Sequence, residues 1–205
     1  MIQVPKIIQL PFRVPTEVVN AILNLRKSRE EAQPYINKWY NAPIDVYTIQ
    51  WITEDYIKEK KLSGLLKLSQ GELAEALEYH ALAKCWVVDN EDVTIIRNFI
   101  DKYFNSVFGF RIHVLGPKRF IDDAAGHRWP RIFIPALNDD CKYTIIDSEG
   151  KSHSMYYKVG NCYLWDVRLS HHVVNENQNL ERVIATFMIN PQEEKNLLRV
   201  LNSTG

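Results

Sequence analysis

The stretch GNCYLWDVRLSHHVVNENQNLERVIATFMIN, residues 160–190, contains two short apolar runs with a polar segment between them. Asp166 ends the run CYLW, His171 follows five residues later, and Arg182 opens the run RVIATFMI. Short runs rich in β-branched and aromatic residues and bounded by turn residues are typical of β-strands. A chain that leaves one such strand, crosses a loop and enters the next brings His171 and Arg182 toward one cavity between two sheets.

The side chains of His171 and Arg182 are of types that hold a small ligand. A neutral imidazole binds transition metals, and the planar fork of a buried arginine grips a carboxylate. Each has a plain structural alternative: His171 as an ordinary histidine at a strand end, and Arg182 paired with a surface acid such as Glu181. Asn175 either caps a turn or belongs to the same site. We expect His172 to point away from His171, because side chains alternate along an extended segment.

Further strand patterns follow one another from residue 110 onward. The runs are FRIHVLG, RIFIPALN and KYTIIDSEGKSHSMYYKV. Within the last run, residues 148–151 lie between two alternating segments and predict a hairpin turn. His113 alternates with apolar neighbours and is expected to be a satisfied strand residue rather than a ligand. Several strands at this spacing predict a sandwich or a barrel.

Helical patterns dominate the first half of the chain. Thr16 precedes the apolar stripe of PTEVVNAILNLRKSREEA, and Ser69 opens SQGELAEALEYHALAKCW in the same way. Residues 92–108 form a third amphipathic pattern. The predicted fold class is therefore α+β, with a mainly helical region at residues 1–109 packed on a barrel formed by residues 110–205.

Composition narrows the range of partners. The chain has 25 basic and 25 acidic residues, so no broad electrostatic field gathers nucleic acid or an anionic membrane surface. Three widely spaced cysteines indicate neither a disulfide framework nor a cysteine metal clamp. Neither a signal peptide nor a long uncharged apolar run is found. We therefore expect a cytoplasmic protein whose partner is a small molecule, and the sequence predicts no particular oligomeric state.

The segments between residues 110 and 190 resemble the cupin-like iron(II)/2-oxoglutarate oxygenases of the aspartyl/asparaginyl β-hydroxylase type. In that family a strand ends in an acidic residue, a distal iron-binding histidine and a pattern xVxN follow, and an arginine then binds the far carboxylate of 2-oxoglutarate. RIFIPAL, residues 131–137, is similar to another strand of the family, and HVLGPKRFI to the segment that leads into its metal loop. The matching positions here are Asp166, His171, Val173, Asn175 and Arg182.

This resemblance implies a double-stranded β-helix, or jelly roll, with the site at the mouth of the barrel. It implies iron(II) and 2-oxoglutarate as cofactors, with His171 and Arg182 as the catalytic residues and His171 as a metal ligand. Arg131 and Asn175 would join Arg182 in contacting 2-oxoglutarate, although Arg131 also has a strand-end alternative. The implied activity is hydroxylation, or another oxidation, of an amino acid or a related small acidic metabolite.

The metal loop departs from the family pattern. Ala124 and Gly126 occupy the positions of the proximal histidine and its partner carboxylate, and neither a methyl group nor a hydrogen donates to a metal. A slipped loop would present nearby side chains as replacement ligands, although the two aspartates are also typical of a solvated turn. Together with His171, the candidate metal ligands are Asp122, Asp123 and His127.

Two other classes of function stay open. The departure at the metal loop favours a metal-free member of the fold that keeps Arg182 for an acidic ligand, either a binding or scaffold protein or an enzyme of another reaction type. A structural or assembly role would use the helical half as its working surface. The charged segments LRKSREEA and IKEKKLSG of that half are, however, typical of solvated helix faces.

Overall fold

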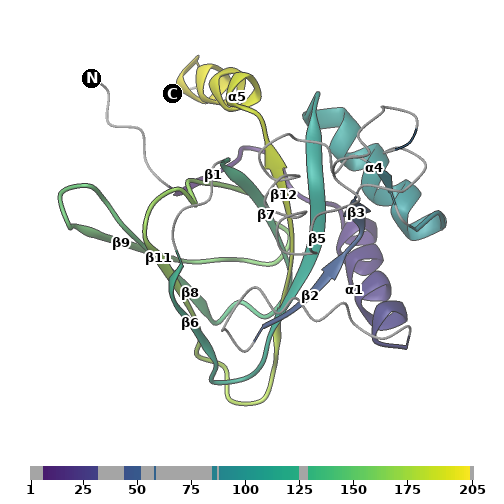
Figure 1. Cartoon of the computed structure of the whole chain (residues 1–205), viewed down its shortest axis with the longest axis horizontal. Helices are drawn as coiled ribbons and strands as arrows, with labels where there is room; N and C mark the ends of the chain where they lie inside the picture. Colours follow the sequence, from purple (N-terminus) through teal and green to yellow (C-terminus); the bar gives the residue numbers. More distant parts are fainter. Residues whose placement is uncertain are drawn as a thin grey trace.

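The computed structural model describes residues 7–31, 44–51, 58, 85–86, 88–124 and 129–203. These residues form two antiparallel sheets that lie as two layers (Figure 1). The larger sheet has the strand order β1 (Ile7–Gln9), β10 (Tyr163–Trp165), β7 (Arg131–Leu137), β12 (Arg182–Ile189), β5 (Val107–Leu115) and β2 (Ile44–Thr48). The smaller sheet has the order β6 (Phe120–Ala124), β11 (His171–Asn175), β8 (Cys141–Ile146) and β9 (Ser152–Tyr156). A separate ribbon pairs β3 (Gln50–Trp51) with β4 (Cys85–Trp86).

The central strands of the larger sheet are buried on both faces, which explains their nearly continuous apolar sequences. In β12, Val183, Ala185 and Phe187 belong to the core that includes the helices. The alternate residues Arg182 and Ile184 face the interior between the two sheets. Strands β5 and β7 divide their side chains in the same way, so each central strand contributes to two separate cores.

Two helices cover the outer face of the larger sheet, as Figure 1 shows: α1 (Thr16–Glu31) and α4 (Glu91–Tyr103). In α1, Val18, Ile22 and Leu25 are buried at helical spacing. This layer shields one face of the sheet from water and leaves the other face to form the interior of the barrel. The predicted helix at Thr16 is therefore confirmed, together with its apolar stripe.

A third helix, α5 (Pro191–Ser203), follows β12 directly. Its first turn is held by the side chain of Asn190, which accepts a hydrogen bond from the backbone N–H of Glu193 at 2.8 Å. None of the helices in the part of the chain that the structure describes is long and apolar enough to cross a membrane.

The predicted turn at residues 148–151 is confirmed and joins β8 to β9. The Oδ1 atom of Asp147 accepts hydrogen bonds from the backbone N–H groups of Glu149 and Lys151, each at 2.9 Å. Gly150 has a φ of 78°, a conformation that costs glycine little. Side-chain capping and glycine together fix the register of the hairpin.

The region at residues 1–109, predicted to be mainly helical and packed on the barrel, also supplies strands to the larger sheet. Besides α1 and α4, the described part of this region contains strands, and β1 and β2 are the two edge strands of the larger sheet. Both are short, with three and five residues, and so give little alternation to detect. The division at residue 109 therefore does not separate helices from barrel. The helix predicted from Ser69 lies outside the described residues.

The predicted helix at residues 92–108 also ends earlier than expected. Asn90 caps α4 by accepting from the backbone N–H of Val93 at 2.9 Å, but the helix stops at Tyr103, and Phe104 is extended with φ −135° and ψ 134°. Val107 then begins β5. The β-branched and aromatic residues at this point favour the strand.

Candidate active site

A cavity lies between the two sheets, with a volume of ≈ 50 Å³. At 10–15 Å³ for each ordered water, this volume holds about four water molecules, the space of a small organic molecule. Its apolar lining comes from both sheets, and it also contains five side chains with polar groups: His113, Arg131, Trp165, His171 and Arg182. The structure thus brings together three residues predicted to form a site, Arg131, His171 and Arg182.

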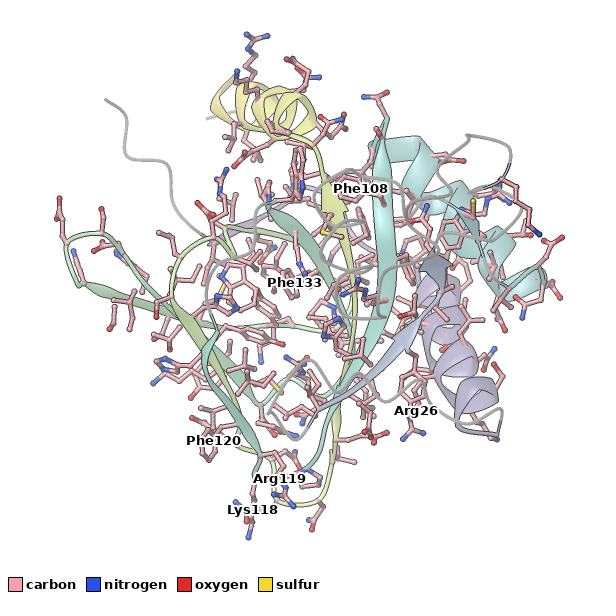
Figure 2. All side chains as sticks on the ribbon, viewed as in Figure 1. Arg26, Phe108, Lys118, Arg119, Phe120 and Phe133 are labelled. Atoms are coloured by element: carbon pink, nitrogen blue, oxygen red, sulfur yellow. The ribbon has the colours of Figure 1, made fainter. Side chains whose placement is uncertain are left out.

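Among the side chains labelled in Figure 2, Phe133 lines the cavity and the others do not. Phe133, on β7, lies between the two layers, and its ring contacts that of Trp165 at a centroid distance of 4.6 Å. Lys118, Arg119 and Phe120 instead gather at the tip where β5 returns into β6, away from Phe133. The two basic residues of this tip therefore belong to the surface.

Arg182 is the first residue of β12 and is only 3% exposed. Its Nη1 atom donates a hydrogen bond to the hydroxyl of Tyr143 at 2.6 Å, and the guanidinium lies 5.5 Å from the centre of the Tyr143 ring. The Nε–H group has no acceptor within the described part of the chain. Glu181 pairs instead with Arg26 of α1 at 2.6 Å, so the alternative of an Arg182–Glu181 surface pair is wrong.

No described carboxylate neutralises Arg182. The buried carboxylates among the described residues are Asp147 and Glu193. Asp147 binds His153 at 2.8 Å, and Glu193 accepts from the backbone N–H of Asn105 at 3.1 Å. Burying a charge without a partner of opposite sign is costly, so the surroundings of Arg182 favour an anion.

Tyr143 does not act as that anion. Burial raises the pKa of its phenol well above the ordinary value, and the neighbouring Arg182 opposes only part of this effect. The phenol is therefore neutral near pH 7 and acts as a hydrogen-bonding support for the guanidinium. Tyr143 is itself held rigidly, since its ring stacks on Tyr157 at 3.7 Å and Tyr157 stacks on Tyr163 at 4.3 Å.

His171 is the first residue of β11 and is 6% exposed. Its Nδ1 atom lies 2.7 Å from the carbonyl oxygen of Leu169. Because a carbonyl only accepts, Nδ1 must carry the hydrogen, and the neutral ring then has its lone pair on Nε2. This arrangement is common in metal-binding histidines. The ring also packs beside Trp165 at a centroid distance of 4.9 Å.

The strand register places Ala124 directly opposite His171. These residues pair across β6 and β11, whereas Val173 pairs with Ile121, so β6 contains one extra residue between the two pairs. Such a bulge bends the strand and redirects side chains. The register thus pairs His171 with Ala124, the residue at the position that the family resemblance assigns to a second histidine.

Iron(II) does not fit the described residues. Oxygenases of this class bind it with two histidines and a carboxylate. Among the residues with described side chains, no three from histidine, cysteine, aspartate and glutamate lie close enough to hold a metal ion. The side chains of Asp122 and Asp123, and the whole of His127, lie outside the description. Their roles as metal ligands therefore stay predictions.

Asn175, predicted to contact 2-oxoglutarate, does not line the cavity. It is fully buried, and its Nδ2 atom lies within hydrogen-bonding distance of the carbonyl oxygens of Leu180 and Gly116 at 2.9 and 3.0 Å. Its Oδ1 atom accepts from the side chain of Asn138 at 2.9 Å. This geometry agrees with the other predicted role, in which Asn175 caps a turn, because its hydrogen bonds connect two loops.

Asp166 likewise lies away from the cavity lining. Its carboxylate accepts from Nε of Arg168 at 2.6 Å, and Arg168 also contacts Glu194 of α5 at 2.9 Å. Through Arg168, Asp166 thus connects the loop before His171 to α5. His172 is less buried than His171, which agrees with the predicted alternation.

Sequence reasoning missed two side chains of the cavity, His113 and Trp165. His113 is a buried strand residue, as predicted, and its Nε2 atom lies 3.2 Å from the hydroxyl of Thr186. It also lines the cavity, because β5 alternates Phe110 and Ile112 toward the helices with His113 toward the interior. Trp165 ends the run CYLW, whose pattern indicates an apolar strand and gives no sign of a role in a site.

Stability is expected to fall steeply between about pH 9 and about pH 11. Burial raises the pKa of the Cys141 thiol to about 11, and it raises the pKa values of Cys162, Tyr143 and Tyr157 well above the ordinary values of these groups. The folded state then holds protons that the unfolded chain releases, so each group costs about 1.4 kcal/mol per pH unit above its ordinary pKa. Urea unfolding at about pH 8 and about pH 10 measures this loss. An unchanged midpoint would contradict it.

Comparisons with known proteins show the fold. No family model and no curated protein matches the chain. Among solved structures, a Pseudomonas putida prolyl-4-hydroxylase matches 89% of this chain and 91% of its own, with a TM-score of 0.52 and 11% identity. The α-ketoglutarate-dependent epimerase SnoN of nogalamycin biosynthesis matches 89% of this chain and 77% of its own, with a TM-score of 0.47 and 10% identity. An oxalate oxidase matches 39% of this chain and 41% of its own, with a TM-score of 0.35 and 14% identity.

The prolyl-4-hydroxylase likeness, which spans nearly the whole of both chains, shows that this chain shares the fold of that enzyme, and its two facing antiparallel sheets agree with a double-stranded β-helix. The predicted jelly roll is confirmed at this level. At 11% identity the likeness shows the fold alone, because one fold supports many unrelated functions.

Proposed function

We propose that the protein binds a small carboxylic acid in the cavity between its two sheets, with 2-oxoglutarate as the leading candidate. The observation that carries this proposal is Arg182, a guanidinium buried at the cavity with a neutral tyrosine as its hydrogen-bond partner. A carboxylate is the anion whose two oxygens match the guanidinium fork.

The surrounding residues support this role in three ways. Tyr143 orients the guanidinium, and its stacked neighbours limit the movement of both groups. The apolar and aromatic lining excludes water, which strengthens the attraction between guanidinium and carboxylate. Arg131, 4% exposed and also at the cavity, adds positive charge to the ligand's surroundings.

We further propose that the protein is an oxygenase-like enzyme, which uses this site to oxidise an amino acid or a small acidic metabolite. The fold likeness and the single tautomer of His171 support it. When bound, iron(II) would supply the oxidation of the substrate. The described side chains do not complete its ligand set, so no iron-dependent step follows from them. The alternative is a metal-free acid-binding protein that uses the same Arg182 site.

Calorimetric titration of the chelator-treated protein tests the proposed ligand. 2-Oxoglutarate is expected to bind saturably at one site, and its dimethyl ester at least about tenfold more weakly, because the ester lacks the charge that pairs with Arg182. Equal binding of acid and ester, or no binding of either, would reject the carboxylate site.

An anaerobic titration with iron(II) and 2-oxoglutarate then separates the oxygenase from the metal-free protein. A visible charge-transfer band that disappears in the His171→Ala variant would support iron binding, with Asp122, Asp123 or His127 completing the site. Binding of 2-oxoglutarate without any bound iron would support the metal-free alternative.

A further inference from the structure

Trp165 carries a buried polar group that the proposed carboxylate–Arg182 contact does not use. Its ring lines the cavity and is 2% exposed. The indole N–H has no hydrogen-bond acceptor among the described residues. A buried donor without an acceptor is costly, and the great majority of buried polar groups are paired. A ligand atom with a lone pair would supply the missing acceptor.

The strand pairing separates the backbone of Trp165 from that of Arg182 along the larger sheet. Trp165 is directly opposite Arg131 in the β10–β7 pair, and Arg131 is opposite Met188 in the β7–β12 pair. Met188 lies six residues after Arg182 along β12, which is about 20 Å at the rise of a strand. Their side chains nevertheless line one cavity together with Arg131. The Tyr143 ring lies 5.0 Å from the Trp165 ring and 5.5 Å from the Arg182 guanidinium, so one small ligand can reach both residues.

The part of the cavity beside Trp165 combines a donor with positive charge. The Arg131 side chain is 4% exposed and lies at the same cavity. The ring of His171 packs against Trp165, so the two residues occupy the region where the family resemblance would place a metal ion. The described residues in this part of the cavity therefore favour an anionic oxygen directly.

We infer that Trp165 and Arg131 form a second anion subsite, which holds the other acidic group of a dicarboxylate without a metal ion. This inference rests on the proposed binding of a carboxylate by Arg182 and adds the requirement for two acidic groups in one ligand. The indole N–H donates to one carboxylate oxygen, and the Arg131 guanidinium supplies the opposite charge. Selectivity for dicarboxylates over monocarboxylates follows.

Nuclear magnetic resonance of the full chain, labelled with ¹⁵N at its tryptophans and kept in a metal chelator, tests this subsite. The chain has five tryptophans, and the Trp165→Phe variant identifies the indole signal of Trp165 by its loss. The ligands are 2-oxoglutarate, glutarate and 2-oxobutyrate, a monocarboxylate whose one acidic group is expected to pair with Arg182 and to leave the second subsite unfilled. Titration gives the affinity of each ligand and the indole signals that move.

Both dicarboxylates are expected to bind at least about tenfold more tightly than 2-oxobutyrate, with the Trp165 indole signal moving most. Trp165→Phe should lower dicarboxylate affinity by about tenfold and leave 2-oxobutyrate within about twofold. Arg131→Gln should reduce the same preference, and Arg131→Lys should restore part of it. These comparisons are internal to each variant, and circular dichroism checks that each one folds.

Three results would overturn the subsite. One is equal affinity for 2-oxobutyrate and 2-oxoglutarate; another is saturable dicarboxylate binding that leaves the Trp165 indole signal unmoved. The third is dicarboxylate selectivity that appears only after iron(II) is added, which would assign the second subsite to a metal. Each of these leaves the Arg182 site intact, whereas failure of all three acids to bind would reject the proposed function itself.

Discussion

Arg182→Gln is expected to lower the affinity for 2-oxoglutarate by at least about 100-fold, because it removes the buried charge and the fork that we propose for the carboxylate. Calorimetric titration of the chelator-treated protein measures this change. Arg26→Gln is the matched control, since Arg26, on α1, pairs with Glu181 and does not line the cavity. Its effect should stay within about twofold. Unchanged affinity in Arg182→Gln would contradict the site.

The same variant should leave the ligand-free protein as stable as before, or make it more stable. Removing one partner of a buried ion pair destabilises a protein by about 3–5 kcal/mol, because the other charge is left uncompensated. Arg182 has no carboxylate partner in the described chain, so its loss removes a desolvation cost and one hydrogen bond to Tyr143. Thermal unfolding without ligand distinguishes the two cases. A large loss of stability would indicate that a protein carboxylate pairs with Arg182.

Asn175→Ala is expected to lower the free energy of unfolding by about 3 kcal/mol or more. The amide is fully buried and bonds to the carbonyl oxygens of Gly116 and Leu180 and to the side chain of Asn138. Its removal takes one hydrogen bond from each of these groups. The Gly116 carbonyl then keeps only a longer bond from the Arg119 N–H, and the Leu180 carbonyl one from the Asn138 amide, each at 3.3 Å. Urea unfolding measures the loss.

The control for this effect is Asn179→Ala, an exposed asparagine in the same loop, which should change the free energy of unfolding by about 0.5 kcal/mol at most. The affinity of folded Asn175→Ala for 2-oxoglutarate should stay within about twofold. A loss of affinity with unchanged stability would instead assign Asn175 to the ligand, as the family resemblance implies.

The strands of the barrel could be predicted from the sequence because their patterns are local. RIFIPAL and RVIATFMI are apolar at nearly every position, and both are central strands with two buried faces. The edge strand β1 has only three residues, and its place in the sheet depends on pairing with β10, far along the chain. No local pattern reports such a pairing.

The candidate site could be predicted only in part for the same reason. Arg182 and His171 stand out because charged or titratable residues begin apolar runs. The neutral partner of Arg182, Tyr143, comes from a strand of the other sheet. Trp165 looks like any strand aromatic until the fold leaves its N–H without an acceptor. Burial and the identity of a distant partner decide these roles, and neither is visible in a single sequence.

The pairing of Ala124 with His171 shows what can and cannot be inferred from the spacing of residues in the sequence. Counting along the chain identified Ala124 as the residue at the expected second histidine position, and the register places it opposite His171. Counting does not reveal the extra residue in β6 between Ile121 and Ala124. A one-residue change of register moves side chains to the other face of a strand. The predicted rescue of a metal site by Asp122, Asp123 or His127 therefore depends on geometry beyond the sequence.

A crystal structure of the chelator-treated protein with saturating 2-oxoglutarate would decide whether the cavity is a carboxylate site. The expected result is one carboxylate in hydrogen-bonding contact with the Arg182 guanidinium and the other next to the Trp165 indole N–H and Arg131. An empty cavity, with the guanidinium of Arg182 paired to a carboxylate of the protein itself, would contradict both the proposed function and its extension to dicarboxylates.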